Sequence, residues 1–488
     1  MAGEECRQPI TELNRGNSMN TQVDVVVIGA GSAGLAAIRQ VKKRTDSFVL
    51  VNERPYGTTC ARVGCMPSKA LIEAANAYHA RHRAEAFGIR GSAALSIDIP
   101  AVLQRVRSLR DRFVSGVLKA TESLGERSIE GKARLVGPNT VQVHDQLFEA
   151  QSIIIATGSH PVVPDAWRTL GDRLLTTDTF FEQQTLPSSM AVIGLGPLGV
   201  EMAQALARLG VEIHAFSNSS RLAGISDPLV SDCLRTALGR EMTLNTGHDV
   251  ELSATRNGVR VQAGPIDQEV EKVLVAIGRQ PNLDGIGLSA LGLKLDERGL
   301  PPFDSTTMQI TDLPIFIAGD VNAYRGLLHE AADEGYIAGI NAVSAEVTCF
   351  ERRTPLAVVF SSPGVAIIGQ RHADLDPGKF TTGCVDFSSQ GRALTAQRNE
   401  GILRVYAARD SGRILGAEMC APAAEHLAHL VALAIHRGLT ASDLLAMPFY
   451  HPVLEEGLRT ALREVTRESR FEHSDLAACE GFQIEALD

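Results

Sequence analysis

The chain has 488 residues, of which 44% are hydrophobic and 21% charged, and its formal net charge is −10. This composition is typical of an ordinary globular protein, and the acidic balance argues against nucleic acid as the main ligand. No uninterrupted apolar stretch is long enough to cross a bilayer, so we expect no membrane span. Eight cysteines are too few for a disulfide scaffold in a chain of this length.

Residues 1–22 are expected to form a flexible, polar N-terminal extension. They lack a basic region followed by an apolar one, so we expect no secretory signal. We therefore expect a cytoplasmic location, where thiols stay reduced unless a pair is catalytic.

A dinucleotide-binding fingerprint opens the expected globular part. A β-branched run at 24–28 leads directly into Gly29-Ala-Gly-Ser-Ala-Gly34, and a helical stretch at 35–43 and an apolar strand at 48–51 follow. A glycine-rich turn without a ligand is the alternative, but strand, glycines, helix and second strand all agree with the fingerprint. The pattern predicts phosphates at the N-terminus of the helix.

Each residue of the fingerprint has a physical task. Gly29 permits the tight turn, Gly31 lets the pyrophosphate approach the backbone, and Gly34 lets helix and strand pack closely. Glu53, just beyond the second strand, can accept hydrogen bonds from a ribose.

Two cysteines, Cys60 and Cys65, follow the fingerprint. Their spacing alone favours two unconnected buried thiols, because this spacing is not diagnostic. Their position beside a redox cofactor site reverses that preference, since a dithiol and a flavin each exchange two electrons. Pro67 indicates a helix start, which would bias Cys65 toward the thiolate. The other cysteines show no pair spacing and are interpreted as structural or incidental: Cys6, Cys233, Cys349, Cys384, Cys420 and Cys479.

The arrangement recurs later in the chain. A strand at 190–193 precedes Gly194-Leu-Gly-Pro-Leu-Gly199, and a helix at 201–209 and a strand at 211–216 follow. Two fingerprints imply two dinucleotides that can exchange electrons.

The second fingerprint leaves the choice between NAD and NADP open. The strand ends in Ser217 and not in an acid, which removes repulsion against a 2′-phosphate, and Arg221 could bind one. The alternative is a polar surface loop without a ligand.

The C-terminal part carries a His-Pro segment. Pro452 favours a helix start, and Glu456 near that start complements the helix dipole. His451 is then either a cap, a packed imidazole or, beside a carboxylate, an acid/base for thiol chemistry. His426 and His429 are interpreted as packing or interface residues, so we predict no metal site.

Together these motifs resemble the flavin-dependent pyridine nucleotide–disulfide oxidoreductases, from about residue 23 to the mid-460s. Further motifs in the same order support the likeness: Ile155-Ala-Thr-Gly-Ser-His-Pro161, Ala276-Ile-Gly-Arg-Gln-Pro-Asn282, Ile317-Ala-Gly-Asp320, Leu328-His-Glu-Ala-Ala-Asp-Glu-Gly335 and Phe360-Ser-Ser-Pro-Gly-Val-Ala366. Within the family, Cys-Met-Pro-Ser-Lys looks like the dihydrolipoyl dehydrogenase branch.

The resemblance implies an α/β fold with two Rossmann-like dinucleotide-binding domains and a C-terminal α+β dimerisation domain. The implied segments are an extension (1–22), an FAD-binding domain (23–160), an NAD(P)-binding domain (161–282), a return to the FAD domain (283–350) and an interface domain (351–488).

The resemblance also implies a role for each matching residue. The redox and acid/base set would be Cys60 facing substrate, Cys65 facing flavin, Lys69 ion-paired with Glu201, and His451 held by Glu456. FAD would be bound by Gly29, Gly31, Gly34, Glu53, Thr59, Lys69, Ala133, Thr157, Gly158, Gly319 and Asp320. The nicotinamide dinucleotide would be bound by Gly194, Gly196, Gly199, Ser217 and Gly278.

The implied activity is oxidation of a dihydrolipoyl dithiol, on a lipoylated carrier protein or as dihydrolipoamide, with FAD as cofactor and NAD⁺ as acceptor. The family likeness implies a homodimer in which His451 serves the partner's disulfide. Two rivals remain: an NADPH-dependent reductase of a small disulfide or mercuric ion, and an FAD-bearing subunit kept for assembly.

The chain departs from the family pattern at several positions. Thr58 replaces a usual Gly and Gly364 a usual acid, and the surroundings of His451 differ at Phe449, Tyr450, Val453 and Glu455. Because the last cluster is expected at the substrate entrance, these departures bear on the substrate more than on the chemistry.

Overall fold

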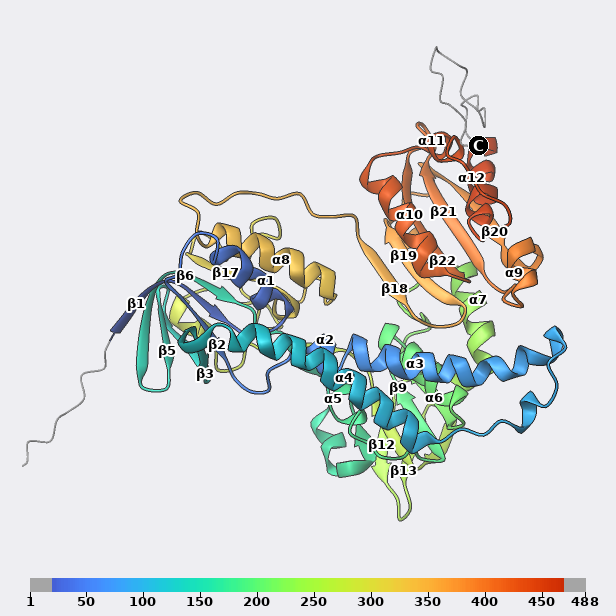
Figure 1. Ribbon diagram of the computed structural model, residues 1–488, viewed down its shortest axis with the longest axis horizontal. Coiled ribbons are helices and arrows are strands. Elements are labelled where there is room, and N and C mark those ends of the chain that lie inside the picture. Colours follow the sequence, from blue (N-terminus) through green and yellow to red (C-terminus); the bar gives the residue numbers. More distant parts are fainter. Residues whose placement is uncertain (1–19, 469–488) are drawn as a thin grey trace, which may run out of the picture. The chain divides into compact units, whose positions relative to one another are not determined.

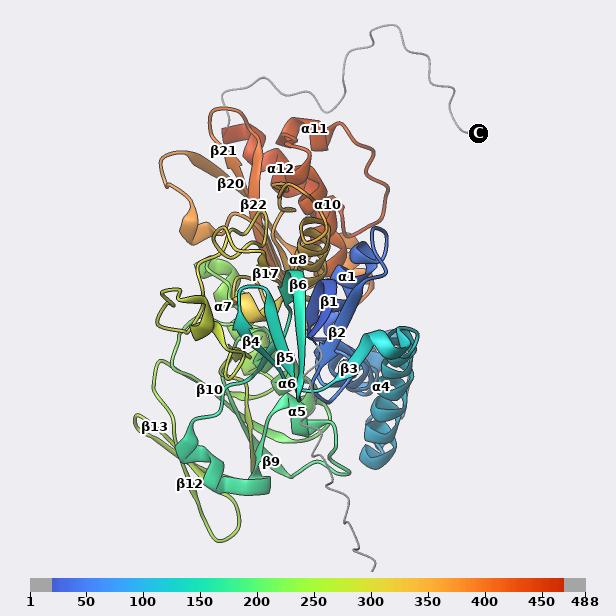
Figure 2. The same cartoon turned by 90° about the vertical axis from the view of Figure 1, so that its left-hand side faces the viewer.

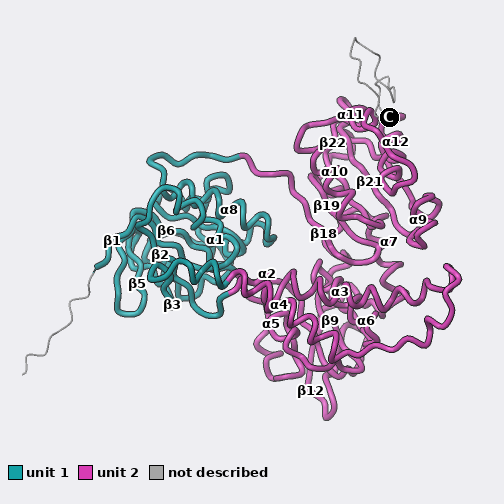
Figure 3. The backbone as a smooth tube through the Cα atoms, in the orientation of Figure 1, with its two compact units in different colours: residues 1–56, 118–158, 281–350 teal, residues 57–117, 159–280, 351–488 magenta. Residues whose placement is uncertain are grey.

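The computed structural model describes residues 20–468. Residues 1–19, with most of the expected extension, and residues 469–488 lie outside the described residues. The chain forms two compact units, coloured separately in Figure 3. Unit 1 contains residues up to 56, 118–158 and 281–350, and unit 2 contains 57–117, 159–280 and the part from 351. The segment boundaries expected from the sequence remain a prediction.

Unit 1 is built on a seven-stranded sheet in the order β3-β2-β1-β6-β5-β4, with β17 also paired to β6 (Figure 2). The strands are β1 (Asn20–Ile28), β2 (Phe48–Asn52), β3 (Ser128–Glu130), β4 (Ala133–Gly137), β5 (Thr140–Val143), β6 (Gln146–Ile155) and β17 (Ile315–Ile317). β3, β2, β1, β6 and β17 pair in parallel, whereas β4 and β5 form antiparallel pairs. The Val-Val-Val-Ile run ending β1 is fully buried, as expected for a parallel strand covered on both faces.

Two helices of unit 1 pack tightly on one another, α1 (Ser32–Val41) and α8 (Leu328–Asn341). Small residues allow the approach: a Cβ at Gly335 would lie 2.1 Å from the carbonyl oxygen of Ala33. A Cβ at Gly339 would lie 2.6 Å from that of Ala37. α1 follows the first glycine turn, so this packing supports the helix whose N-terminus forms that turn.

Unit 2 contains a second parallel sheet, in the order β11-β10-β9-β15-β8. Its strands are β8 (Leu174–Leu175), β9 (Ser189–Ile193), β10 (Glu212–Ser217), β11 (Thr243–Thr246) and β15 (Lys272–Val275). Smaller sheets consist of β12 (Glu251–Ala254), β13 (Val259–Ala263) and β14 (Ile266–Val270), and of β7 (Ser159–Pro161) with β16 (Arg279–Pro281). The helices of this part are α2 (Thr59–Arg62), α3 (Cys65–His79), α4 (Ile99–Glu122), α5 (Thr177–Phe180), α6 (Pro197–Arg208) and α7 (Pro228–Gly239).

The C-terminal part of unit 2 is an antiparallel sheet in the order β18-β19-β22-β21-β20. Its strands are β18 (Leu356–Val359), β19 (Gly364–Gly369), β20 (Phe380–Asp386), β21 (Ile402–Ala408) and β22 (Ile414–Ala421). The accompanying helices are α9 (Gly391–Thr395), α10 (Ala424–His436), α11 (Ala441–Leu445) and α12 (Glu456–Glu468). In Figure 1, α10 and α12 accompany this sheet, with α10 packed on β19 and β22 and α12 on β20.

The expected fold class is confirmed: each unit has a core of parallel strands with a glycine turn between strand and helix, and unit 2 also contains the C-terminal α+β part. The expected helix start at Pro452 is wrong, because α12 begins at Glu456. Tertiary contacts take the backbone groups that a helix would need. The Gln390 side chain donates to the carbonyl of Val453 at 2.7 Å, and the Val453 N–H faces the Glu456 carboxylate at 3.3 Å.

Candidate active site

The two cysteines following the first glycine turn form an asymmetric thiol pair. Cys60 lies on α2, Cys65 is the first residue of α3, and both are free thiols. The hydrogen bond from Cys60 and the positive charge of Lys69 together lower the pKa of Cys65 to about 6, while burial and the carboxylate of Glu201 oppose the shift. The pKa of Cys60 is raised, first because its proton is held in that hydrogen bond and then by burial. Cys65 is therefore the thiolate of the pair at neutral pH.

An ion pair lies one helical turn beyond Cys65. The Lys69 ammonium contacts the carboxylate of Glu201 on α6, with Nζ 2.7 Å from Oε2 and 3.0 Å from Oε1. Glu201 is buried, with 4% of its side chain exposed, and also accepts the Phe360 N–H at 2.9 Å. Lys69 lies over the Phe360 ring, 4.6 Å from its centroid. Phe360 belongs to one of the sequence motifs, but the motif does not reveal its contact with both charges.

Thr58 explains how the chain turns before the pair. Its backbone has φ 45° and ψ 144°, a conformation that favours glycine. Its hydroxyl accepts the Ala61 N–H at 3.2 Å and so caps α2. Compared with the glycine usual in the family, Thr58 strains the backbone but adds a side-chain cap to α2.

The first glycine turn, in unit 1, has the shape of a phosphate cradle. Gly29 has φ +109°, and a Cβ there would lie 2.2 Å from the carbonyl oxygen of Ala156. A Cβ at Gly34 would lie 1.9 Å from the oxygen of Gly29, so this contact requires glycine. Beside Gly31 the nearest such atom is 3.9 Å away, which leaves its backbone open to a ligand. These residues fit a bound dinucleotide.

Other residues predicted to bind FAD also lie in unit 1. The Thr157 hydroxyl donates to the Asn282 carbonyl at 2.8 Å, and the Asn282 amide donates to the Thr157 carbonyl at 2.9 Å. Asn282 therefore holds the turn of Thr157 and Gly158, a role that the sequence motif did not reveal. Glu53 is exposed just after β2, and Ala133 is buried at the start of β4.

A buried carboxylate holds the Gly319–Asp320 turn. The Gly319 N–H donates to Glu334 at 2.7 Å, and the Asn322 amide donates to the same oxygen at 2.8 Å. Glu334 is completely buried, so it fixes the backbone immediately before Asp320. The sequence showed Glu334 only as part of the α8 motif, because its partners lie in another segment.

The second glycine turn repeats the geometry of the first within unit 2. Gly194 has φ +97°, with a Cβ position 2.4 Å from the Ala276 oxygen, and a Cβ at Gly199 would lie 1.8 Å from the Gly194 oxygen. Gly196 has no such atom within 4 Å, so its backbone is open. Gly278 is equally open and has φ +126°. The turn fits a second dinucleotide.

The loop after β10 is the part of the second dinucleotide site that bears on the choice between NAD and NADP. Ser217 is buried, and its hydroxyl accepts the Ser219 N–H at 3.2 Å. Arg221 is exposed. Arg235 on α7 donates to the Ser220 carbonyl at 2.6 Å, which brings a second guanidinium to the loop.

His451 and Glu456 form a separate pair. The imidazole Nδ1 lies 3.0 Å from Oε2 and 3.1 Å from Oε1 of the carboxylate, and Arg459 donates to Oε1 at 3.0 Å. The hydrogen bond with His451 is the main cause that lowers the pKa of Glu456. The His451 side chain is 79% exposed. Within residues 20–468, no hydrogen bond or ion pair joins His451 to Cys60 or Cys65.

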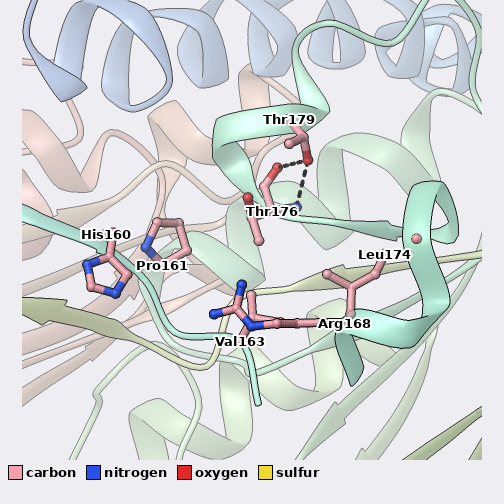
Figure 4. A pocket seen from close by; sticks show the side chains of 8 residues that line it. His160, Pro161, Val163, Arg168, Leu174, Thr176 and Thr179 are labelled. Carbon is pink, nitrogen blue, oxygen red and sulfur yellow. Dashed lines mark hydrogen bonds between the residues drawn. The ribbon is translucent and has the colours of Figure 1, made fainter. Parts of the chain in front are cut away.

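A pocket of about 370 Å³ lies elsewhere in unit 2 (Figure 4). It is lined by His160, Pro161, Val163, Arg168, Gly171, Leu174, Thr176 and Thr179. The Thr179 hydroxyl, which accepts the Thr176 N–H at 3.1 Å, is engaged in capping α5. None of the predicted site residues lines this pocket.

In the described part of the chain, no group of three or more His, Cys, Asp or Glu side chains is placed to hold a metal. His426 lies on α10, 74% exposed, beside Glu425. None of the helices within residues 20–468 has the length and hydropathy needed to cross a membrane.

Two family models match the sequence. The pyridine nucleotide-disulphide oxidoreductase model covers residues 23–335, and the dimerisation-domain model of the same family covers residues 356–462. The chain therefore belongs to the pyridine nucleotide-disulphide oxidoreductase family, as the motifs indicated.

Relatives with named activities define the branch. Dihydrolipoyl dehydrogenase of Halobacterium salinarum is 31% identical over 464 residues, which cover 91% of this chain and 96% of the relative. The enzymes of Thermus scotoductus (30%, covering 91% and 98%) and Chlamydia pneumoniae (32%, covering 90% and 96%) carry the same name. The chain is thus a dihydrolipoyl dehydrogenase-like flavoprotein disulfide oxidoreductase, of a family that depends on FAD and a pyridine nucleotide.

Solved structures share the fold. LpdA from Mycobacterium tuberculosis has a TM-score of 0.80 at 24% identity, covering 91% of this chain and 99% of that chain. The Cu(II) complex of the HOCl-induced flavoprotein disulfide reductase RclA from Escherichia coli has the same TM-score at 22% identity, with the same coverage.

Proposed function

We propose that this protein oxidises a protein-bound dihydrolipoyl dithiol to the disulfide and delivers the electrons to NAD⁺. The observation that carries the proposal is the asymmetry of Cys60 and Cys65: one thiol keeps its proton and the other is a thiolate beside Lys69. Such a pair suits an exchange in which one sulfur reacts with substrate and the other leaves. The names of the relatives support the dihydrolipoyl substrate.

The cysteine chemistry balances in two exchanges. A substrate thiol gives its proton to His451, and the resulting thiolate attacks Cys60 of the oxidised pair, so Cys65 leaves as a thiolate. The second substrate thiol then loses its proton and attacks the first substrate sulfur, and Cys60 leaves and takes that proton, while His451 keeps the first one. The substrate becomes a disulfide, and the enzyme holds the dithiol state in which the structure shows the pair.

The two glycine turns support the cofactor assignment. FAD would be held at Gly29, Gly31 and Gly34, and the nicotinamide dinucleotide at Gly194, Gly196 and Gly199, where the backbone is open to phosphates. When bound, FAD would supply the two-electron acceptor between the dithiol and the nicotinamide. Lys69 would stabilise the Cys65 thiolate by its positive charge, and Glu201 would hold Lys69 in place through the ion pair.

The acid/base would come from a second copy of the chain. Glu456 orients the His451 imidazole through Nδ1, which leaves Nε2 to exchange protons. Exposure of the ring in one chain agrees with a site completed by a partner, and the dimerisation-domain match supports a homodimer.

The test is turnover by the purified, flavin-loaded protein. We expect NADH formation from dihydrolipoamide and NAD⁺, its loss in Cys60→Ser, and flavin bleaching on titration with dihydrolipoamide. No lipoamide turnover, together with strong NADPH-dependent reduction of glutathione disulfide or mercuric ion, would overturn the proposal.

One observation favours the alternative, an NADPH-dependent reductase. Arg221 and Arg235 both lie at the loop after β10, and β10 ends in Ser217 in place of an acid. Two guanidinium groups suit a 2′-phosphate. A ratio of NADPH to NADH turnover that falls on Arg221→Gln would identify the loop as an NADP site.

A further inference from the structure

Two cysteines far apart in sequence meet inside unit 2. Cys233 lies on α7, which follows the second nucleotide-binding sheet, and Cys420 lies on β22 of the C-terminal antiparallel sheet. α7 packs against β22, and both cysteines belong to the same hydrophobic cluster. Cys233 packs against the buried cluster that contains Cys420, and each thiol is the largest influence on the pKa of the other. These cysteines show no pair spacing in the sequence, because spacing along the chain does not show contacts made by folding.

The two thiols differ in the way that a reactive pair requires. Cys420 is completely buried and Cys233 is half-buried. Cys420 lowers the pKa of Cys233 against the opposing effects of burial and of the carboxylates of Glu400 and Asp386, and Arg240 adds a smaller effect in the same direction as Cys420. Cys233 and burial raise the pKa of Cys420 well above its usual value. Cys233 is thus the accessible nucleophile, and Cys420 is the protonated partner behind it.

We propose that Cys233 and Cys420 form a second, peroxide-sensitive thiol pair that closes to a disulfide joining α7 to β22. The Cys233 thiolate attacks one oxygen of hydrogen peroxide, the O–O bond breaks, and sulfenic acid and hydroxide form. Cys420 gives its proton to that hydroxide and attacks the Cys233 sulfur, and the sulfenic oxygen leaves as water once protonated. Two thiols lose two electrons, and one peroxide becomes two waters.

Other cysteines of the described chain provide internal comparisons. Cys384 is half-buried like Cys233, but burial raises its pKa and Glu464 adds to the shift. Cys349 is exposed and its thiol contacts the Thr306 hydroxyl at 3.3 Å. Neither has a second cysteine recorded beside it among residues 20–468, so oxidation there would stop at sulfenic acid.

The experiment uses the full-length, flavin-loaded protein after reduction and removal of the reductant. Hydrogen peroxide is added until the Cys60–Cys65 pair is oxidised, free thiols are alkylated, and unreduced peptides are analysed by mass spectrometry. We expect a linked peptide containing Cys233 and Cys420, two hydrogens lighter than the separate peptides and lost on reduction. Recovery of both as alkylated thiols would overturn the proposal.

Two variants test the order of events. Cys420→Ala should leave sulfenic acid on Cys233, so trapping with dimedone should rise several-fold over wild type. Cys233→Ser should leave Cys420 as an unreacted thiol, and Cys384→Ser should still form the linked peptide. Equal dimedone trapping on Cys233 in wild type and Cys420→Ala would contradict closure of the pair. The wild-type peptide map decides the question even if a variant folds poorly.

Discussion

At the scale of single residues, the reactivity of Cys65 depends on opposing charges. Cys60 and Lys69 lower its pKa, whereas burial and the carboxylate of Glu201 raise it. The ion pair therefore moderates the thiolate as well as stabilising it. Phe360 holds both charges in place through its N–H and its ring.

Substitutions in the ion pair should move the pKa of Cys65 in opposite directions. Lys69→Met removes a positive charge, so the pKa should rise and alkylation of Cys65 at pH 6 should slow several-fold. Glu201→Gln removes a negative charge, so the pKa should fall. The measurement is the rate of iodoacetamide labelling of Cys65 against pH, followed by peptide mapping.

Lys272→Met is the matched control, because Lys272 is also half-buried but bonds to Gln183 away from the cysteines. It should leave the labelling profile unchanged. Shifts of the same sign in Lys69→Met and Glu201→Gln would refute the electrostatic account.

Thr58 offers a second residue-scale test, since its strain and its cap can be separated. Thr58→Ala loses the cap and keeps a strained backbone, so it should destabilise by about 1 kcal/mol. Thr58→Gly relieves the strain, and glycine at an N-cap costs only about a few tenths of a kcal/mol although the hydroxyl is lost, so it should stabilise by about 1 kcal/mol. Urea unfolding of the flavin-loaded protein measures both, and Thr58→Gly less stable than Thr58→Ala would show that the strain is negligible.

At the scale of elements, glycines decide how closely helices approach. The first glycine turn depends on α1, and α1 is held against α8 through contacts that leave no room for a Cβ at Gly335 or Gly339. Such positions are constrained by packing and not by helix propensity. A glycine on an exposed helix face has no such packing constraint, so helix propensity alone decides the effect of replacing it.

Gly335→Ala and Gly116→Ala should therefore have opposite effects. The Cβ at Gly335 would meet backbone 2.1 Å away, so overpacking should cost about 1–3 kcal/mol and weaken flavin retention. Gly116 lies exposed on α4 with no atom within 4 Å of its Cβ position, so alanine should stabilise by up to about 1 kcal/mol. Urea unfolding and flavin content report both, and equal effects would mean that α1 and α8 can separate without cost.

At the scale of the whole molecule, the exposed imidazole of His451 requires an explanation. Its carboxylate partner is firmly held by Arg459, yet 79% of the His451 side chain faces outward. A proton acceptor for two substrate thiols works best where bulk water is excluded. A second copy of the chain would supply that environment in the proposed homodimer.

Complementation between inactive chains tests this arrangement. Co-expressed Cys60→Ser and His451→Gln chains, isolated as a heterodimer with two different tags, have one intact site and one doubly defective site. The heterodimer should show about half of wild-type lipoamide activity, although each parent homodimer is inactive. A heterodimer as inactive as its parents would place each site within one chain.

Local sequence patterns were enough to predict the two glycine turns, the thiol pair and the family of this protein. The β-branched strands, glycine turns and following helices were predictable at Gly29–Gly34 and Gly194–Gly199, because a turn between strand and helix is set by neighbouring residues. The Cys60 and Cys65 pair was predicted from its position directly after the first glycine turn, since its spacing alone favoured two unconnected thiols. The motifs also identified the family, which the matching family models confirm.

Contacts between distant segments were decided only by the tertiary structure. The Gln390 side chain bonds to the Val453 carbonyl, and α12 begins only at Glu456. Glu334 accepts the Gly319 N–H, and Glu201 of the Lys69 ion pair accepts the Phe360 N–H. Cys233 and Cys420 met for the same reason: packing of α7 on β22 buries apolar surface and brings two thiols together. Hydrogen bonds and burial act between groups that are close in space, and sequence separation does not encode that distance.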